Sequence, residues 1–166
     1  MRIKLKMILL TIVMVISSTM GTHLFAEEKQ SSREMSPSTQ VTFGGYNPLK
    51  LHDGVVRLLI DKKIMEPDEA NKIVKELREG EKTGGVYIAG VNTLQAFEKL
   101  ANTLIKNKVI TKQDVEQITD KAKQSGGVKI GGYNVVVLYA GLLDTLINSG
   151  KINLSEGQNV LNEAKK

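Results

Sequence analysis

The chain has 166 residues, a length typical of one domain, and 41% of them are hydrophobic, which is enough to build a core. Aromatic residues make up 4% and tryptophan is absent, so the core must be mainly aliphatic. The net charge is +5, but residues 1–26 hold three basic and no acidic residues, which leaves 20 basic and 18 acidic residues, or +2, in 27–166. This weak charge excludes the concentrated basic face of a nucleic-acid-binding protein.

Residues 1–26 have the pattern of a cleaved secretory signal. Arg2, Lys4 and Lys6 form a positive start, and Met7–Ile16 is apolar apart from one threonine. A ten-residue apolar stretch is too short for a membrane anchor, which needs about 20 residues. Cleavage is expected after Ala26, with Gly21 as the alternative. The sequence thus predicts a periplasmic or secreted protein whose mature form has no membrane span.

Residues 27–40 are polar, rich in serine and interrupted by Pro37. Such a segment cannot bury apolar surface, which predicts a flexible linker. The chain contains no cysteine, so neither disulfides nor a lipoprotein signal are possible.

The remainder, 41–166, contains an internal repeat in three copies, 41–80, 86–125 and 128–166. The phrase LIDKKIME at 59–66 recurs as LIKNKVIT at 104–111 and as LINSGKIN at 146–153. Upstream of this phrase, a second short segment recurs, which ends in the pattern Gly-x-Asn. Its asparagine precedes the first leucine of the phrase by 12 residues in every copy: Asn47, Asn92 and Asn134. Three segments in one ungapped register predict a single domain of three tandem units.

Each unit is predicted to be a short strand followed by two helices. Apolar residues two apart indicate the strand, and the glycine after it (Gly45, Gly90 or Gly132) indicates a positive φ or a close approach of the backbone. The asparagine is a good cap for the first helix, and Thr111 with Asp114 and Asn153 with Glu156 resemble capping boxes for the second. Met65, Ile110 and Ile152 are expected to fill the turns between the helices. Lys99 is expected at an exposed position of a first helix.

The predicted fold class is therefore mostly α with short β-strands. The three strand–helix–turn–helix units are expected to pack side by side as helical hairpins, because one unit cannot bury its own apolar face. Their strands are expected to pair into a small sheet or ribbon.

The second copy, at 100–125, resembles the bacterial SHOCT module, a short hairpin of two helices around a capped turn. The matching residues are Leu104, Val109, Ile110, Thr111, Asp114, Ile118 and Lys121. This sequence departs from the module in its missing aromatic residue, in its triplication and in the strand before each hairpin. The resemblance implies interaction or oligomerisation and transfers no catalytic residue.

No pattern of catalytic, cofactor-binding or metal-binding residues stands out. His52, beside Asp53, is the only histidine after residue 26, but the equivalent positions hold Phe97 and Tyr139, which predicts a structural niche for a ring. The glycines of 126–132 lack the lysine and hydroxyl residue of a phosphate-binding loop. No calcium-loop pattern occurs. We therefore expect a protein that is not an enzyme, with no cofactor and no metal.

Aromatic residues of the strand segments are the candidate binding surface: Phe43, Tyr46, Tyr87 and Tyr133. The favoured function is protein–protein interaction or self-association in the periplasm or cell envelope. The alternative is a ligand- or cell-wall-binding module that uses these tyrosines.

Overall fold

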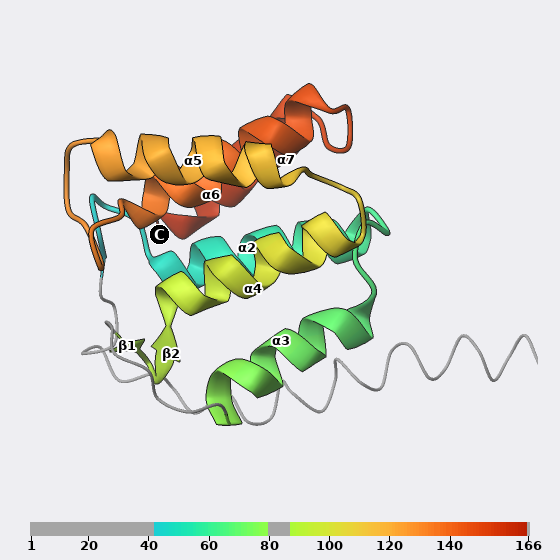
Figure 1. Cartoon of the computed structure of the whole chain (residues 1–166), viewed down its shortest axis with the longest axis horizontal. Coiled ribbons are helices and arrows are strands. Elements are labelled where there is room, and N and C mark those ends of the chain that lie inside the picture. Colours follow the sequence, from blue (N-terminus) through green and yellow to red (C-terminus); the bar gives the residue numbers. More distant parts are fainter. Residues whose placement is uncertain (1–41, 80–86, 166) are drawn as a thin grey trace, which may run out of the picture. The chain divides into compact units, whose positions relative to one another are not determined.

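The computed structural model of the chain describes residues 42–79 and 87–165 (Figure 1). The predicted signal, 1–26, and the predicted linker, 27–40, lie outside the described residues. All described elements belong to one compact unit, Thr39–Lys166. They are α2 (Pro48–Asp61), α3 (Pro67–Glu79), β1 (Tyr87–Ile88), β2 (Val91–Asn92), α4 (Thr93–Lys106), α5 (Lys112–Gln124), α6 (Val135–Asn148) and α7 (Leu154–Ala164). This mostly helical composition with very short strands confirms the predicted fold class at that level.

The same local geometry precedes α2, α4 and α6. A tight turn leads to an asparagine whose side-chain oxygen accepts hydrogen bonds from the second and third backbone amides after it, at 3.0–3.3 Å. These are the predicted caps Asn47, Asn92 and Asn134. Each cap satisfies amide groups that the first turn of a helix would otherwise leave without partners.

The starts of the second helices also follow the sequence. Thr111 with Asp114 and Asn153 with Glu156 form complete capping boxes at the starts of α5 and α7. The helix α3 begins at Pro67, and the Glu69 carboxylate accepts a hydrogen bond from the backbone amide of Glu66. The turn residues Met65, Ile110 and Ile152 are all buried, as expected.

The observed sheet is smaller than the one predicted. Among the described residues, β1 and β2 pair with each other as the only two-stranded sheet, Tyr87 opposite Asn92 and Ile88 opposite Val91. The other two turns each form a single bridge, Phe43 with Tyr46 and Ile130 with Tyr133. Because a helix begins right after each turn, the extended segments are too short to reach one another. Val128, expected in a strand, is exposed and lies outside any strand.

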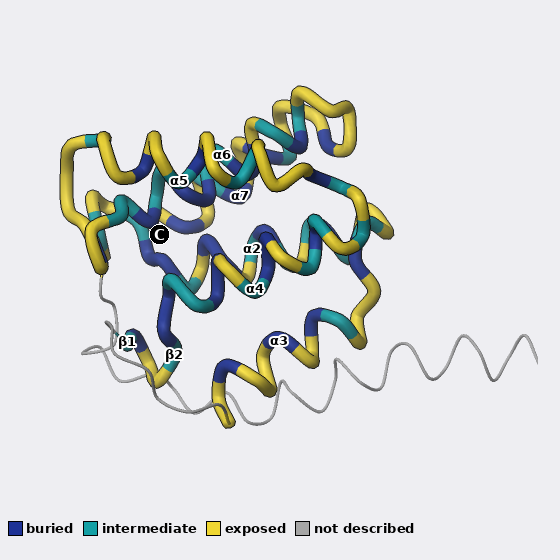
Figure 2. The backbone as a smooth tube through the Cα atoms, viewed as in Figure 1, coloured by how far each residue is buried: buried dark blue, intermediate teal, exposed yellow. Residues whose placement is uncertain are grey.

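The helices form two sets. The helices α2, α4 and α6 contact one another and carry most of the buried side chains, whereas α3, α5 and α7 each bury a narrow stripe against them (Figure 2). The most extensive contact of each second helix joins α3 to α4, α5 to α6 and α7 to α2. Each second helix therefore packs mainly on the first helix of another segment. The last of these contacts joins the final helix to the first, so the three segments close on themselves.

This closure differs from the expected row of hairpins. In such a row the two helices of each hairpin pack on each other, and only the middle copy has two neighbours. In the structure each first helix contacts both other first helices. The physical reason is the breadth of the apolar surface on the first helices: α6 buries six residues, Val135, Leu138, Tyr139, Leu142, Leu143 and Leu146, which one partner helix cannot cover.

Three glycines adopt the predicted positive φ just before the caps: Gly45 (82°), Gly90 (80°) and Gly132 (86°). A Cβ built on any of these would meet no atom within 4 Å. The backbone conformation, rather than a close approach of another element, therefore requires glycine here.

Replacing Gly90 with valine is expected to lower the free energy of unfolding by about 1–2 kcal/mol, because a β-branched residue is strained at positive φ. Gly126→Val is the matched control, since Gly126 has an ordinary φ and equally open surroundings. Urea unfolding of both variants and the parent measures the difference. Equal midpoints for the two variants would show that φ at position 90 is unimportant.

Candidate functional site

The four aromatic residues predicted as a binding surface lie in the turns before α2, α4 and α6. In Figure 1 these turns gather on the left, where the three helices begin. Phe43, Tyr46, Tyr87 and Tyr133 are all half-buried. The Lys165 ammonium lies 5.2 Å from the centre of the Tyr46 ring, and that of Lys123 lies 5.4 Å from the centre of the Tyr133 ring. Two of the four rings therefore hold the ends of α7 and α5 in place by cation–π contacts.

His52 is buried beside the residues at its equivalent positions. Its Nδ1 lies 3.0 Å from the Tyr139 hydroxyl, and the Tyr139 ring meets His52 and Phe97 edge to face, with centroid distances of 6.0 and 5.5 Å. Burial lowers the pKa of His52 to about 4, and burial together with the Asp53 carboxylate raises the pKa of Tyr139. The predicted structural niche is confirmed.

Two grooves follow the junctions between neighbouring helices. The α3–α4 groove, about 320 Å³, is lined by Glu69, Lys72, Ile73, Glu76, Lys99, Asn102, Thr103 and Lys106. A larger groove of about 880 Å³ lies between α5 and α6 and includes Asp114, Gln117, Ile118, Lys121 and Gly141. Under the predicted repeat, these four residues of α5, namely Asp114, Gln117, Ile118 and Lys121, occupy the positions of Glu69, Lys72, Ile73 and Glu76 in α3. None of the four aromatic residues lines either groove, and neither does His52.

The helix junctions differ at one equivalent position. Gly54, Lys99 and Gly141 each follow their cap asparagine by seven residues. A Cβ on Gly54 would lie 3.0 Å from Val160 of α7, and one on Gly141 would lie 3.1 Å from Ile118 of α5. At these two junctions the absent side chain lets the helices approach closely. At the third junction Lys99 occupies this position, and α3 contacts α4 less extensively.

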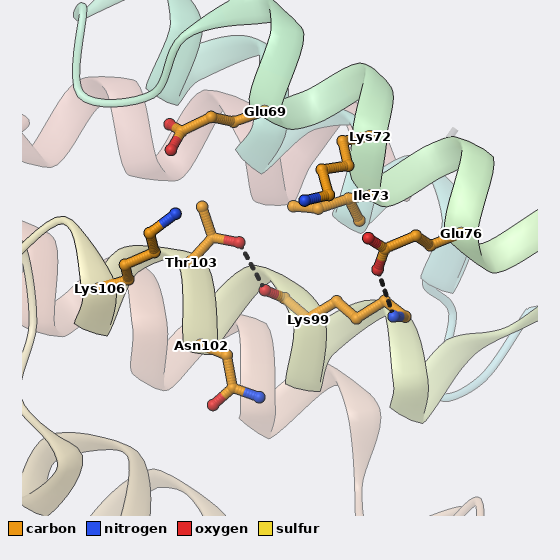
Figure 3. A pocket seen from close by; sticks show the side chains of 8 residues that line it. All are labelled: Glu69, Lys72, Ile73, Glu76, Lys99, Asn102, Thr103 and Lys106. Carbon is orange, nitrogen blue, oxygen red and sulfur yellow. Dashed lines mark hydrogen bonds and ion pairs between the residues drawn. The ribbon is translucent and has the colours of Figure 1, made fainter.

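Lys99 crosses the α3–α4 groove to pair with Glu76. Its Nζ lies 2.6 Å from Glu76 Oε2 (Figure 3). The hydrogen bond and charge of Lys99 lower the pKa of Glu76, and the charge of Lys72 adds to this effect. Lys99 is therefore half-buried rather than fully exposed as expected, and its ammonium forms a solvent-accessible bridge between two helices.

The other charges of the α3–α4 groove are less completely paired. Asn107 Nδ2 donates a hydrogen bond to Glu69 Oε2 at 2.8 Å. Within the described part of the chain, Lys72 and Lys106 form no ion pair within 4 Å of a carboxylate. Three ammonium groups thus face two carboxylates that are already bonded, and the groove favours a ligand that carries negative charge.

Sequence reasoning missed this groove. The sequence does differ at this point, because Lys99 occupies the position that Gly54 and Gly141 hold after the other caps. The consequence of this difference depends on which helix lies opposite. In residues 42–79 and 87–165, no three acidic or histidine side chains gather where they could hold a metal ion.

Comparison with known proteins adds no relative. No protein-family model, no curated protein and no solved structure matches the chain.

Proposed function

We propose that the chain is an exported binding protein without enzymatic activity, which takes a segment of a protein partner in the α3–α4 groove. It works in the periplasm or outside the cell after cleavage of the signal near Ala26. None of the helices in the described part has the length and apolar character to cross a bilayer.

In this proposal the folded part consists of three copies of one strand–helix–turn–helix unit, 41–80, 86–125 and 128–166. The shared sequence phrases, the three asparagine caps and the three glycines at positive φ support a common unit. The resemblance of the second copy to SHOCT hairpins also supports an interaction role.

The observation that carries the proposal is Lys99. In three copies of one unit, equivalent junctions are expected to pack equivalently unless a difference serves a purpose. Lys99 replaces the close helix contact that Gly54 and Gly141 allow with an ion pair across the α3–α4 groove. The α5–α6 groove is larger but holds two lysines and two aspartates, so the excess of positive charge, and not the volume, distinguishes the α3–α4 groove. An exposed ion pair such as Lys99–Glu76 contributes at most about 1 kcal/mol to folding. Lysine is also a better helix former than glycine. Neither of these small gains requires the unpaired charges of the groove, which a binding role would use.

The chemistry of the groove selects the partner. Lys72 and Lys106 offer ammonium groups on opposite walls, and Ile73 supplies an apolar floor. A peptide segment with carboxylates flanking an apolar side chain fits this arrangement. Such charges at the edge of an interface mainly raise the association rate and make it sensitive to salt.

The test is cross-linking and recovery of partners from the native envelope fraction. A Lys72→Glu/Lys106→Glu variant is expected to lose the partner that the parent recovers. Lys108→Glu/Lys121→Glu, which makes the same charge change in the α5–α6 groove, is the matched control and is expected to retain it. Recovery of the same partner by all three proteins would refute the proposal.

The alternative is a ligand- or cell-wall-binding module that uses the turn tyrosines. It is favoured by the half-buried aromatic residues in the turns that precede α2, α4 and α6. Tyr87→Ala separates the two functions, because Tyr87 does not line the α3–α4 groove. Loss of binding to purified cell-wall material in this variant, with partner recovery unchanged, would favour the alternative.

A further inference from the structure

The contact of α7 with α2 is the one major helix junction that joins the two ends of the folded part. At the α5–α6 junction the backbone amide of Asn134 donates a hydrogen bond to the carbonyl of Ala122 at 3.1 Å. At the α7–α2 junction the backbone amide of Asn47 donates an equivalent hydrogen bond to the carbonyl of Ala164 at 2.9 Å. Lys123 over Tyr133 and Lys165 over Tyr46 are likewise equivalent. The interface between α5 and α6, which follow each other in the chain, thus has the same contacts as the interface between α7 and α2, which lie at opposite ends of the folded part. The interface therefore forms without a direct chain connection between its two helices.

The helix α7 depends on this interface to be a helix at all. It has 11 residues and contains Gly157, and isolated helices shorter than about 12–15 residues are marginal in water. Its buried stripe, Gly157, Val160 and Ala164, faces α2 and α6. The ion pair of Lys62 with Glu156 adds a polar contact to α2. A released α7 therefore gains its structure only by docking on an α2 again.

The turn before α7 differs from its two counterparts. The left-handed position is Gly150, with φ of 68°, where the other turns have Lys63 at 56° and Lys108 at 57°. Glycine adopts extended and left-handed backbone conformations with similar ease, so the turn at Gly150 can open at a lower cost than the other two turns. A lysine with a Cβ has a narrower choice of backbone conformations.

We propose that this chain associates with a second copy of itself by reciprocal exchange of α7, with the turn 149–153 as the hinge. Each half of the dimer then contains α2–α6 of one chain and α7 of the other. Every contact of α7 with α2 and α6 is regained, and only the closed turn at Gly150 is lost. Exchange of an identical element is a route to dimers that requires no new interface.

The absence of native cysteine gives a direct test. A Cβ on Gly54 would lie 3.8 Å from the Val160 Cβ, and a Cβ on Gly141 would lie 3.5 Å from that of Ile118. Both distances suit a disulfide, for which about 3.5–4.5 Å is usual. Gly54→Cys/Val160→Cys therefore locks α7 to α2, and Ile118→Cys/Gly141→Cys is the matched control within one chain.

The purified exported chains are incubated at rising concentration, oxidised, and separated on a denaturing gel without reductant. We expect the first variant to give a covalent dimer that increases with concentration, while the control gives only cross-linked monomer. A third chain, with Gly150→Val added to the first pair, is expected to give more dimer, because valine strains the closed turn.

Three results would overturn the proposal. Cross-linked monomer alone in the first variant at every concentration would show that α7 stays on its own chain. Dimer in equal amount in the control would show that α7 is not the exchanged element. Failure of the first variant to form any disulfide, while the control does, would show that α7 does not dock on α2. None of these outcomes depends on the α3–α4 groove.

Discussion

The free energy of unfolding is expected to fall by up to about 3 kcal/mol as the pH is lowered from about 7 to about 4. Burial lowers the pKa of His52 from an ordinary value of about 6.5 to about 4 in the folded protein. Between these two values the unfolded chain binds a proton at His52 and the folded chain does not. Stability is therefore complete above about pH 6.5 and is lost as the pH falls toward 4. Urea unfolding at several pH values measures this slope.

The control removes both polar partners at once. In His52→Phe/Tyr139→Phe neither a histidine nor an unpaired hydroxyl remains in the cluster with Phe97. Its stability is expected to be nearly constant between pH 6.5 and 5. The carboxyl groups of Glu76, Asp114 and Glu156, whose pKa values are lowered by hydrogen bonds, contribute only at lower pH. The same slope in parent and double variant over this range would show that His52 is not the cause.

Gly141→Leu is expected to destabilise the fold by about 2 kcal/mol, because even its Cβ would lie 3.1 Å from the Ile118 side chain and the two helices would have to shift. Lys99→Leu, at the equivalent position of α4, is expected to change stability by less than about 1 kcal/mol. A long side chain is already accommodated there, and only an exposed ion pair is lost. Thermal and urea unfolding of both variants provide the comparison.

Equal effects of the two leucine substitutions would contradict the difference between these two helix contacts. Such a result would also remove one support for the α3–α4 groove as a site, because Lys99 would then be equivalent to Gly141 in its packing.

Local features of the fold were predictable from the sequence. Asn92 caps α4, and Thr111 forms a capping box with Asp114, because these hydrogen bonds join residues two or three apart and need no other element. Gly90 was predictable for the same reason, since positive φ is a property of one residue. The burial of His52 followed from comparing copies, because equivalent positions have similar surroundings.

Features that depend on distant partners were not predictable. The stripe of Ile118 and Ala122 indicates that α5 is covered, but not whether α4 or α6 covers it. The closure of α7 on α2 likewise has no signal in either helix alone. For the candidate site, the sequence pointed to Tyr46 and Tyr133, which contact lysines at the ends of α7 and α5. It did not point to Lys99, because a lysine on a helix is ordinary until the opposite wall is known.

The closure of α7 on α2 also limits how this architecture can vary. In an open array each added unit extends the row and leaves the earlier contacts unchanged. Here a further helical pair packed between α7 and α2 would have to separate Asn47 from Ala164, whose backbone groups are hydrogen bonded at 2.9 Å. An added helical pair is thus incompatible with this contact, whereas substitutions at single junctions leave it in place. The same proximity of the first and last helices makes a circularly permuted chain feasible, with new ends in the turn at 107–111.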